Sequence, residues 1–223
     1  ISKTNAVGID TGIKTFATLS DGTEIENPKH LKSNLQRLKV LQKRASKKQK
    51  GSANRKKANL KVARLHEKIA NQRLDFLHKT TTAIAKQYDT VACENLNISG
   101  MLRNHKLAQS IADLGLGRFY TLLQYKITEQ GGNYLEIGRF EPSSKMCGCG
   151  AINKNLQLSD REWVCPECGT INQRDILAAK NILKFALNPK NKTTDGMSGV
   201  AYGDAGVSQV CEVGTISGRS LRP

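Results

Sequence analysis

Nearly all of the excess positive charge of this chain lies in one segment, residues 29–86. The segment contains 18 lysines and arginines but only two acids, Glu67 and Asp75, whereas the rest of the chain carries 17 basic and 17 acidic residues. The formal net charge of +16 therefore belongs to this segment alone. Because like charges repel, the segment is expected on the surface, with nucleic acid as the simplest partner and an anionic membrane surface as the alternative.

The apolar residues of this segment follow the spacing of helices. After Pro28, leucines recur every three or four residues, at Leu31, Leu35, Leu38 and Leu41. The sequence GSAN at 51–54 breaks this pattern, and a second helical pattern follows over about 55–86. We therefore expect a basic helical hairpin over 29–86, with one face packed and the other basic.

This hairpin is predicted to contact phosphates rather than bases. No aromatic residue lies between Phe16 and Phe76, so the hairpin has no ring on which a base could stack. A solvated charged face is the alternative interpretation, but the charge is almost entirely of one sign. The side chains expected at the nucleic acid are Lys43, Arg44, Lys47, Lys48, Arg55, Lys56 and Lys57.

Short apolar segments around the hairpin predict a mixed α/β sheet. We expect strands at 6–9, 14–19, 23–26, 90–95 and 134–137, and helices at about 117–130 and 174–187. Residues 189–223 are expected to be a flexible tail, in which 207–213 could pair as a strand. No glycine-rich phosphate loop and no apolar stretch of 18 residues occur, which excludes the common nucleotide-binding motifs and a membrane-spanning helix.

Four cysteines form two closely spaced pairs, Cys147-x-Cys149 and Cys165-x2-Cys168. Two such turns can direct four sulfurs at one tetrahedral ion, and no histidine lies nearby, so we expect one structural zinc. Disulfides are the alternative. Trp163 is expected to pack over this site, with base stacking as its other possible role.

Three acids occur where apolar strands end or a helix begins. Asp10 and Glu94 each end an apolar strand, and Asp175 opens the helix at 174–187. Each has an ordinary structural interpretation as a turn, strand-end or helix-start acid. Together they could hold divalent cations that act on a phosphodiester. Cys93, which precedes Glu94, is expected to be buried on the opposite face of its strand.

Several segments resemble, in order, the motifs of the TnpB family, the transposon-encoded relatives of type V CRISPR nucleases. They are GIDTGIKTFATLSDG at 8–22, ENLN at 94–97 with Met101, the helix with Phe119, Leu123, Tyr125, Lys126 and Gly131, PSSK at 142–145 with the cysteines, LSDREW at 158–163, and RD at 174–175 with Ala178, Ala179, Asn181 and Ile182. The resemblance extends over roughly residues 5–185.

The resemblance implies an RNase H-like (RuvC) nuclease domain with an inserted zinc ribbon. It divides the chain into a first nuclease part at 1–142 with the hairpin at 29–86, a zinc ribbon at 143–172, a last nuclease part at 173–188 and the tail at 189–223. The family's N-terminal region, which binds RNA and target, is not in this sequence, so we expect the chain to be part of a longer protein.

The resemblance further implies an RNA-guided DNA endonuclease of an insertion sequence, acting in the prokaryotic cytoplasm at the nucleoid rather than at a membrane. Asp10, Glu94 and Asp175 would hold two Mg²⁺ ions and catalyse phosphodiester hydrolysis, and the four cysteines would hold one Zn²⁺. DNA and, in the full-length protein, a guide RNA are the expected partners, and Arg174 could contact the scissile phosphate. The alternative is a guide-dependent nucleic-acid-binding protein or repressor that does not cleave.

Overall fold

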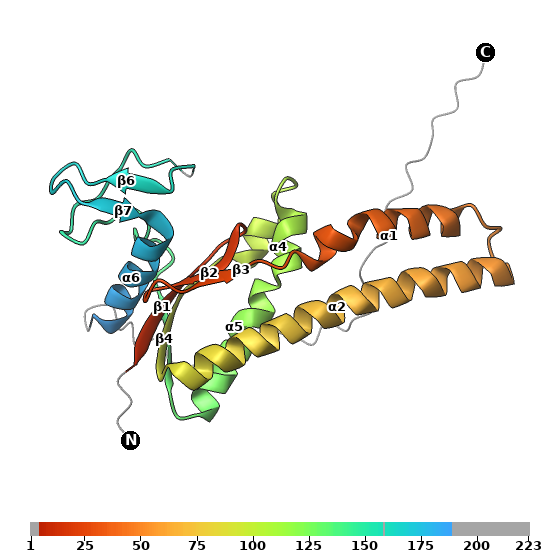
Figure 1. The fold of residues 1–223 in the computed structure, drawn as a ribbon, viewed down its shortest axis with the longest axis horizontal. Helices are drawn as coiled ribbons and strands as arrows, with labels where there is room; N and C mark the ends of the chain where they lie inside the picture. Colours follow the sequence, from red (N-terminus) through yellow and green to blue (C-terminus); the bar gives the residue numbers. More distant parts are fainter. Residues whose placement is uncertain (1–4, 158, 189–223) are drawn as a thin grey trace, which may run out of the picture. The chain divides into compact units, whose positions relative to one another are not determined.

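The computed structural model describes residues 5–157 and 159–188 (Figure 1). The tail expected at 189–223, the strand within it and Cys211 lie outside the described residues. None of the helices in the described ranges is both long and apolar enough to cross a lipid bilayer.

A five-stranded mixed sheet lies at the centre, in the order β3-β2-β1-β4-β5. Its strands are β1 (Ala6–Thr11), β2 (Thr15–Leu19), β3 (Glu24–Glu26), β4 (Thr90–Glu94) and β5 (Asn133–Ile137). In the first three strands each neighbouring pair is antiparallel, β1 with β2 and β2 with β3, whereas β4 and β5 run parallel to β1. The expected mixed α/β sheet is confirmed, although β1 extends through Thr11, so Asp10 lies inside the strand rather than in the turn.

The basic segment forms the expected pair of helices, α1 (His30–Ser46) and α2 (Ala53–Gln87). Leu38, Leu65 and Ile69 form a small buried cluster between them, which explains how two basic helices stay together. The helix α2 begins slightly earlier than predicted because the hydroxyl of Ser52 accepts a hydrogen bond from the Arg55 amide and caps the helix.

The other helices are α3 (Ile98–Leu102), α4 (Ala108–Leu114), α5 (Leu116–Glu129) and α6 (Arg174–Leu187). Neither α3 nor α4 was predicted, since each is too short to show a helical period. On α5, Tyr125 is 50% exposed and therefore only partly packed. Lys126 is buried instead, because its ammonium donates to the backbone oxygen of His78 and to the hydroxyls of Thr81 and Thr82.

The two faces of the sheet pack against different helices (Figure 1). Val7, Ile9, Val91 and Cys93 lie in the main core with apolar residues of α2 and α5. On the opposite face, Ala92 and Ile137 pack against Ile182 of α6. Between β5 and α6 the chain forms a small antiparallel ribbon, β6 (Glu162–Val164) with β7 (Ile171–Gln173), which carries the cysteine turns.

Candidate active site

Two of the three candidate acids lie side by side on neighbouring parallel strands. Ile9 of β1 pairs with Cys93 of β4, so the following residues, Asp10 and Glu94, meet at the same edge of the sheet. Ile9 and Cys93 are buried against α2 and α5. Since side chains alternate along a strand, Asp10 and Glu94 face the other side, where α6 packs. The expected opposite orientation of Cys93 and Glu94 is confirmed.

Asp175 joins these acids because α6 packs directly on β1. A Cβ atom added to Gly8 would lie only 2.0 Å from the backbone oxygen of Ala179, so only glycine allows the helix to come so close. Gly8 and Asp10 share one face of β1. Asp175 lies in the first turn of α6 and lines, together with Asp10, a cavity of about 40 Å³.

The electrostatics of Asp10 reflect this convergence. Its pKa is raised from 3.8 to about 8, mainly by burial and then by the negative charges of Glu94 and Asp175. The nearby positive charges of Arg174 and Arg161 act in the opposite direction. The three acids predicted from the sequence therefore lie within electrostatic reach of one another, with Arg174 close to them.

Arg161 is a residue of this site that sequence reasoning missed. It precedes β6, and its Nη1 atom lies 3.0 and 2.7 Å from the two carboxylate oxygens of Asp175. The backbone amide of Arg174 donates to the backbone oxygen of Arg161 at 2.8 Å, which fixes the cysteine-rich ribbon at the start of α6. Its position depends on a tertiary contact across 14 residues, and no local pattern could have indicated it.

Glu94 also has a partner that was not predicted. The hydroxyl of Ser143 donates to Oε1 of Glu94 at 2.5 Å. The side-chain amide of Asn181 on α6 in turn donates to the backbone oxygens of Ser143 and Met146, at 2.7 and 2.6 Å. These bonds hold the loop after β5 against α6 and fix the position of the Glu94 carboxylate.

The donor set of this cleft fits hard divalent cations. Carboxylate oxygens are the ligands that Mg²⁺ prefers, and three carboxylates gather here in a partly buried place. Their mutual repulsion is only partly offset by the two arginines, so bound positive charge would stabilise the ionised form of Asp10.

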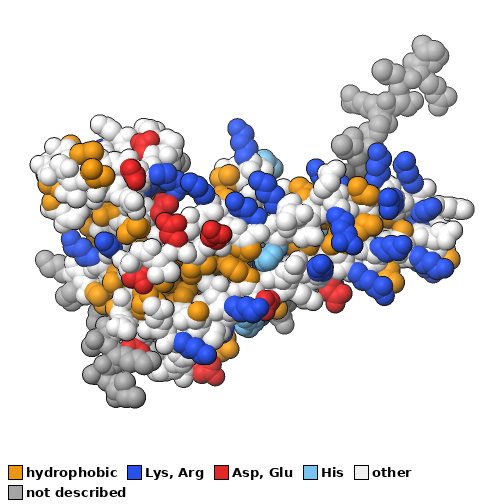
Figure 2. All heavy atoms as spheres, viewed as in Figure 1, with side chains coloured by type: hydrophobic (Ala, Val, Ile, Leu, Met, Phe, Trp, Pro, Cys, Tyr) orange, Lys and Arg blue, Asp and Glu red, His pale blue; other side chains and the backbone are white. Residues whose placement is uncertain are grey.

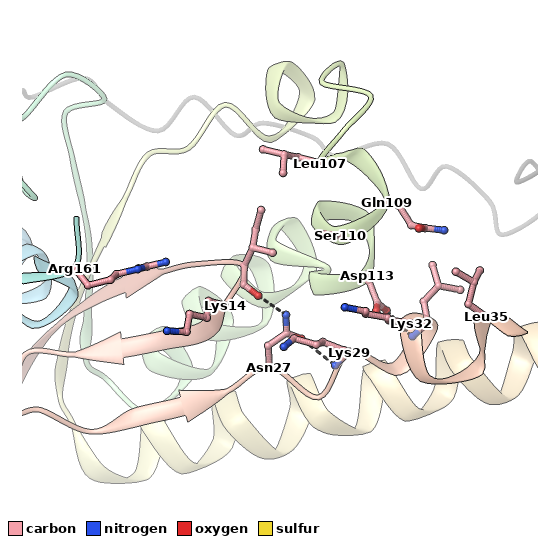
Figure 3. A pocket seen from close by; sticks show the side chains of 12 residues that line it. Lys14, Asn27, Lys29, Lys32, Leu35, Leu107, Gln109, Ser110, Asp113 and Arg161 are labelled. Atoms are coloured by element: carbon pink, nitrogen blue, oxygen red, sulfur yellow. Dashed lines mark hydrogen bonds between the residues drawn. The ribbon is translucent and has the colours of Figure 1, made fainter. Parts of the chain in front are cut away.

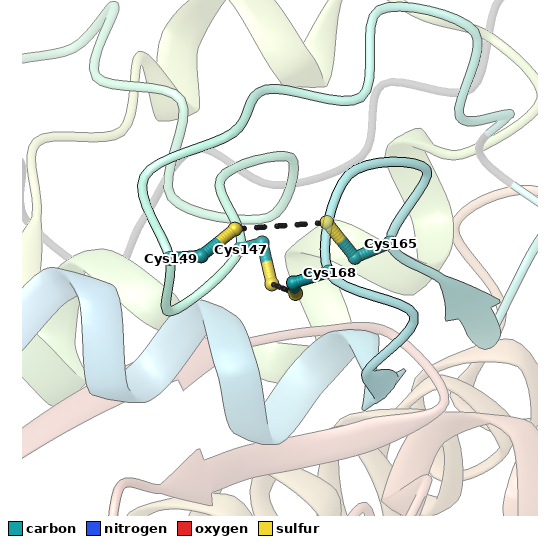
Figure 4. A group of neighbouring side chains, drawn as sticks. All are labelled: Cys147, Cys149, Cys165 and Cys168. Atoms are coloured by element: carbon teal, nitrogen blue, oxygen red, sulfur yellow. Dashed lines mark hydrogen bonds between the residues drawn. The ribbon is translucent and has the colours of Figure 1, made fainter.

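The four paired cysteines form a second possible metal site (Figure 4). Their sulfur atoms all lie within 4.8 Å of one another, and the Sγ–Sγ distance is 3.7 Å for Cys147 with Cys168 and for Cys149 with Cys165. A disulfide requires about 2.05 Å. In a tetrahedral site with Zn–S bonds of about 2.3 Å, sulfurs lie about 3.8 Å apart. The geometry fits one zinc ion and not the alternative of disulfides.

The surroundings shift the pKa values of these thiols in opposite directions. At Cys149 the backbone amide of Ala151 lowers the pKa, but the hydrogen bond with Cys168 and burial outweigh it and raise the pKa to about 12. At Cys168 and Cys147 the thiolate form that binds metal is favoured. The hydroxyl and the backbone amide of Thr170 lower the pKa of Cys168 to about 6. The backbone amide of Cys149 lowers the pKa of Cys147. Trp163 is buried in a cluster with Cys147, Cys165 and Leu177, so its expected packing beside the cysteines is confirmed.

Cys93 has no place in either site. It is fully buried in the main core, and burial raises the pKa of its thiol well above the ordinary range. A thiol that stays protonated is a poor nucleophile. The expectation that Cys93 is a small buried apolar residue is confirmed.

The predicted nucleic-acid residues of the hairpin do not approach the acidic cleft. They lie in the last turn of α1, in the connection to α2 and in the first turn of α2, and all except the partly buried Arg55 are exposed. Figure 2 shows lysine and arginine side chains gathered over the α1–α2 end of the molecule, while acidic side chains gather at the end that contains α6. Of all the residues predicted to contact nucleic acid, only Arg174 lies close to the cleft.

Two family models match the chain in succession. A family described as probable transposase (OrfB_IS605) matches residues 2–105, and a Cas12f1-like TNB domain matches residues 117–182. The first match covers Asp10 and Glu94, and the second covers the four cysteines and Asp175.

Curated relatives and solved structures agree with these matches. A Streptomyces pristinaespiralis protein named "Putative RNA-guided DNA endonuclease" is 46% identical over 185 residues, which are 82% of this chain and 46% of the relative. An Escherichia coli K12 protein named "Putative RNA-guided DNA endonuclease InsQ" is 35% identical over 192 residues, which are 79% of this chain and 48% of the relative. The chain thus spans about half the length of these relatives. A CRISPR-Cas12f ternary complex determined by cryo-EM contains a chain of similar fold, with a TM-score of 0.63 at 20% identity over 87% of this chain and 40% of that one.

Proposed function

This chain belongs to the TnpB family, and we propose that it is the catalytic portion of an RNA-guided DNA endonuclease that depends on Mg²⁺. The observation that carries the proposal is the convergence of Asp10, Glu94 and Asp175 on one edge of the sheet. The names of the curated relatives support DNA cleavage under RNA guidance as the activity of the full-length protein.

The proposed nuclease fold is of the RNase H-like (RuvC) type, interrupted by a zinc ribbon. In this division, residues 1–142 and 173–188 form the nuclease domain and residues 143–172 form the ribbon. The mixed sheet, with its parallel β4 and β5 beside an antiparallel β1–β3, supports this proposal. The ribbon's role is structural, because a closed set of four thiolates leaves no open position on the ion.

Asp10, Glu94 and Asp175 would hold two divalent cations, which supply Lewis-acid catalysis of phosphodiester hydrolysis when bound. Asp10 interacts electrostatically with both of the other acids and would help to hold the cations. Ser143 orients Glu94, and the ion pair with Arg161 orients Asp175. Arg161 and Arg174 would offer positive charge to the phosphate that is cleaved.

The α1–α2 hairpin would hold the nucleic acid by its phosphates without reading its sequence. Its exposed side chains are almost all of one sign, and no aromatic residue is available for stacking between Phe16 and Phe76. We propose the guide RNA or the guide–target duplex as the partner of this surface in the full-length protein.

The test is single-turnover cleavage of DNA by the full-length protein with its guide RNA, in Mg²⁺ and in EDTA. Asp10→Ala should reduce Mg²⁺-dependent cleavage to the level seen in EDTA. Asp75→Ala is the matched control, because Asp75 is an exposed acid on α2 that pairs only with Lys79 in the described structure. This variant should cleave like the unmodified protein.

Cleavage that persists in Asp10→Ala would exclude this cleft as the nuclease centre. Absence of cleavage by the unmodified protein, with guide-dependent binding retained, would favour a protein that binds nucleic acid without cutting it.

A further inference from the structure

Asp10 and Glu94 lie just beyond the last paired residues of the two central strands. The pairing of β1 with β4 runs as far as Ile9 with Cys93, and the two acids are the next residue on each strand. The register of the sheet therefore stops one residue short of the acids. Because carboxylates that share a divalent cation have to keep a fixed separation, another contact is needed to hold the end of β1 in place.

The end of β1 also borders open space. A cavity of about 680 Å³ lies beside the β1–β2 turn and is lined by Ile13, Lys14 and residues of α1 and α4 (Figure 3). Ile13 and Lys14 also line the smaller cavity that contains Asp10. Other side chains do not enclose the strand end on this side, so hydrogen bonds are needed to fix its position.

One edge of this strand end is held from the side of β2 and β3. β2 pairs with β1 through Thr11, the last residue of β1. Beyond it, Nδ2 of Asn27, which follows β3, donates to the backbone oxygen of Ile13 at 2.7 Å (Figure 3). These contacts fix the turn, but they do not connect β1 to β4.

The hydroxyl of Tyr120 holds the strand end from another direction. Tyr120 lies on α5, and its hydroxyl oxygen is 2.7 Å from Oγ1 of Thr11, the residue that follows Asp10. Thr11 shares one face of β1 with Ile9, which packs in the core with residues of α2 and α5, whereas Asp10 faces α6. The hydrogen bond therefore reaches the end of β1 from behind the acid.

Tyr120 is itself fixed in the core that supports both strands. Its ring lies 5.5 Å from that of Phe119 in an edge-on arrangement and packs against the core cluster that includes Cys93 of β4. Burial raises the pKa of its hydroxyl well above the ordinary range, and negative charge at Cys93, Glu94 and Asp10 raises it further. The hydroxyl stays protonated, so it is a hydrogen-bonding group that adds no charge to the acidic cleft.

We propose that Tyr120 is a positioning residue of the cleft: its hydrogen bond with Thr11 fixes the end of β1, so that Asp10 keeps its separation from Glu94. The inference rests on the proposed nuclease function and adds to it a residue that touches neither the DNA nor the cations. Mg²⁺ demands near-ideal octahedral geometry. Loss of a group that orients metal ligands typically costs about 10- to 100-fold in metal affinity or activity.

The first experiment measures Mn²⁺ binding to the full-length protein by electron paramagnetic resonance, because Mn²⁺ takes the same oxygen ligands as Mg²⁺. Tyr120→Phe keeps the ring but removes the hydroxyl, and it should weaken Mn²⁺ binding about tenfold. Thr11→Val removes the other partner and should have the same effect. The double variant should be no weaker than either single variant, because both remove one interaction. Thr11→Ser restores the hydroxyl and should recover most of the affinity.

Tyr88→Phe is the matched control. The hydroxyl of Tyr88 donates to Oδ2 of Asp21, but this pair lies at the opposite end of the sheet, just before β4 and just after β2. Its loss should lower the melting temperature and leave the Mn²⁺ affinity within about twofold. If Tyr120→Phe behaves in the same way, with a lower melting temperature and unchanged Mn²⁺ affinity, the hydroxyl only stabilises the fold and the positioning role is overturned.

Cleavage of DNA in Mg²⁺ with guide RNA separates this inference from the proposed function. Tyr120→Phe should lower the maximal single-turnover rate about tenfold and raise the Mg²⁺ concentration needed for half of that rate. The DNA concentration that gives half of the maximal rate should change little, because Tyr120 does not touch DNA. If no protein cleaves but Tyr120→Phe binds Mn²⁺ more weakly, the nuclease proposal fails and the positioning role stands. If the unmodified protein neither binds Mn²⁺ nor cleaves, both proposals fail.

Discussion

The α1–α2 hairpin and the acidic cleft gather charge in opposite ways. On the hairpin, 18 basic residues are spread over two long helices and the residues that precede and connect them, and most are exposed to water. In the cleft, a few acids are brought together from two strands and one helix, and Asp10 is partly buried with a pKa raised to about 8. Charges on the hairpin repel weakly through solvent, whereas charges in the cleft repel at short range.

Because of this difference, the hairpin and the cleft suit two different kinds of ligand. A spread of solvated charge suits a long polyanion, which replaces many counterions at once. A concentrated, partly desolvated cluster suits small, highly charged cations, because such a cluster is costly until it is neutralised.

The largest expected effect is the loss of zinc and of cleavage in Cys165→Ser. This substitution tests the cleft, because the cysteine-rich ribbon carries Arg161, which pairs with Asp175. Free energy of metal binding at structural zinc sites is also free energy of folding, about 10–16 kcal/mol in zinc-finger peptides. We expect the zinc content to fall from one ion per chain to near zero. The ribbon that holds Arg161 should unfold, and cleavage should be lost. Elemental analysis and limited proteolysis of the full-length protein measure both effects.

Cys93→Ala is the matched cysteine control, because Cys93 is buried in the main core away from the ribbon. Zinc should remain in this variant. Retention of one zinc ion in Cys165→Ser and in Cys168→Ser would contradict the four-thiolate site. Binding of nucleic acid by the hairpin should survive in both ribbon variants, which would show that the two regions act separately.

The next largest effect tests the hairpin side. Reversing the charge at Lys47, Lys48, Arg55, Lys56 and Lys57 should weaken binding of DNA and RNA about 100-fold or more in dilute salt, whatever the sequence. The salt slope should become shallower, because fewer counterions are released. Gel-shift titration at several salt concentrations measures this. Unchanged affinity at moderate salt would contradict the role of the hairpin, and Lys180→Glu with Lys184→Glu on α6 serves as the control.

Gly8→Ala tests whether close packing of α6 creates the cleft. The added Cβ would meet the backbone of both Ala179 and Leu183, which cannot move aside as a side chain would. We expect a loss of about 1–3 kcal/mol in unfolding free energy. Each kcal/mol lowers the melting temperature of a chain of this size by about 2–4 °C. Mg²⁺-dependent cleavage should fall, and hairpin binding should not change.

Gly117→Ala is the control for this substitution. Gly117 lies on α5, where an added Cβ would make only an ordinary contact, at 3.7 Å from Ile98. Alanine also favours the helix by up to about 1 kcal/mol. The prediction about Gly8 is wrong if both alanine variants melt at the temperature of the unmodified protein.

The features predicted from sequence were those with a local signal. Periodic leucines gave the α1–α2 hairpin, and the spacing of Cys147, Cys149, Cys165 and Cys168 gave their cluster. The acids were found by their positions at the ends of apolar segments, but only strand register and the packing of α6 bring them together. Their catalytic role stays a prediction.

What could not be predicted depends on contacts distant in sequence. The three-residue strands β6 and β7 are too short for any period to appear. The pairs Arg161–Asp175 and Ser143–Glu94 join residues that are 14 and 49 positions apart in the sequence. The burial of Lys126 likewise depends on distant contacts, because polar groups of α2 satisfy its ammonium.

The smallest effect, with the opposite sign, is expected for Asp10→Asn without metal. The pKa of Asp10 rises from 3.8 to about 8 on folding, so the native state holds this proton more tightly than the unfolded state. The carboxyl therefore lowers stability as pH rises from 3.8 toward 8, and the cost is complete above about pH 8. Because water screens a partly buried group, we expect asparagine to raise the unfolding free energy by only about 1 kcal/mol at pH 8.5 in EDTA. This gain corresponds to a rise in melting temperature of about 2–4 °C.

The gain should shrink toward pH 5, where Asp10 is already protonated in the native state. Mg²⁺ should stabilise the unmodified protein and reverse the order of the two melting temperatures, because the ionised carboxylate then has a cation to bind. Asp75→Asn, an exposed acid on α2 that pairs with Lys79, should change the melting temperature by less than about 2 °C at either pH. A destabilised Asp10→Asn variant at pH 8.5 in EDTA would mean that Asp10 is already compensated by Arg161 and Arg174, and the contrast between cleft and hairpin would not hold.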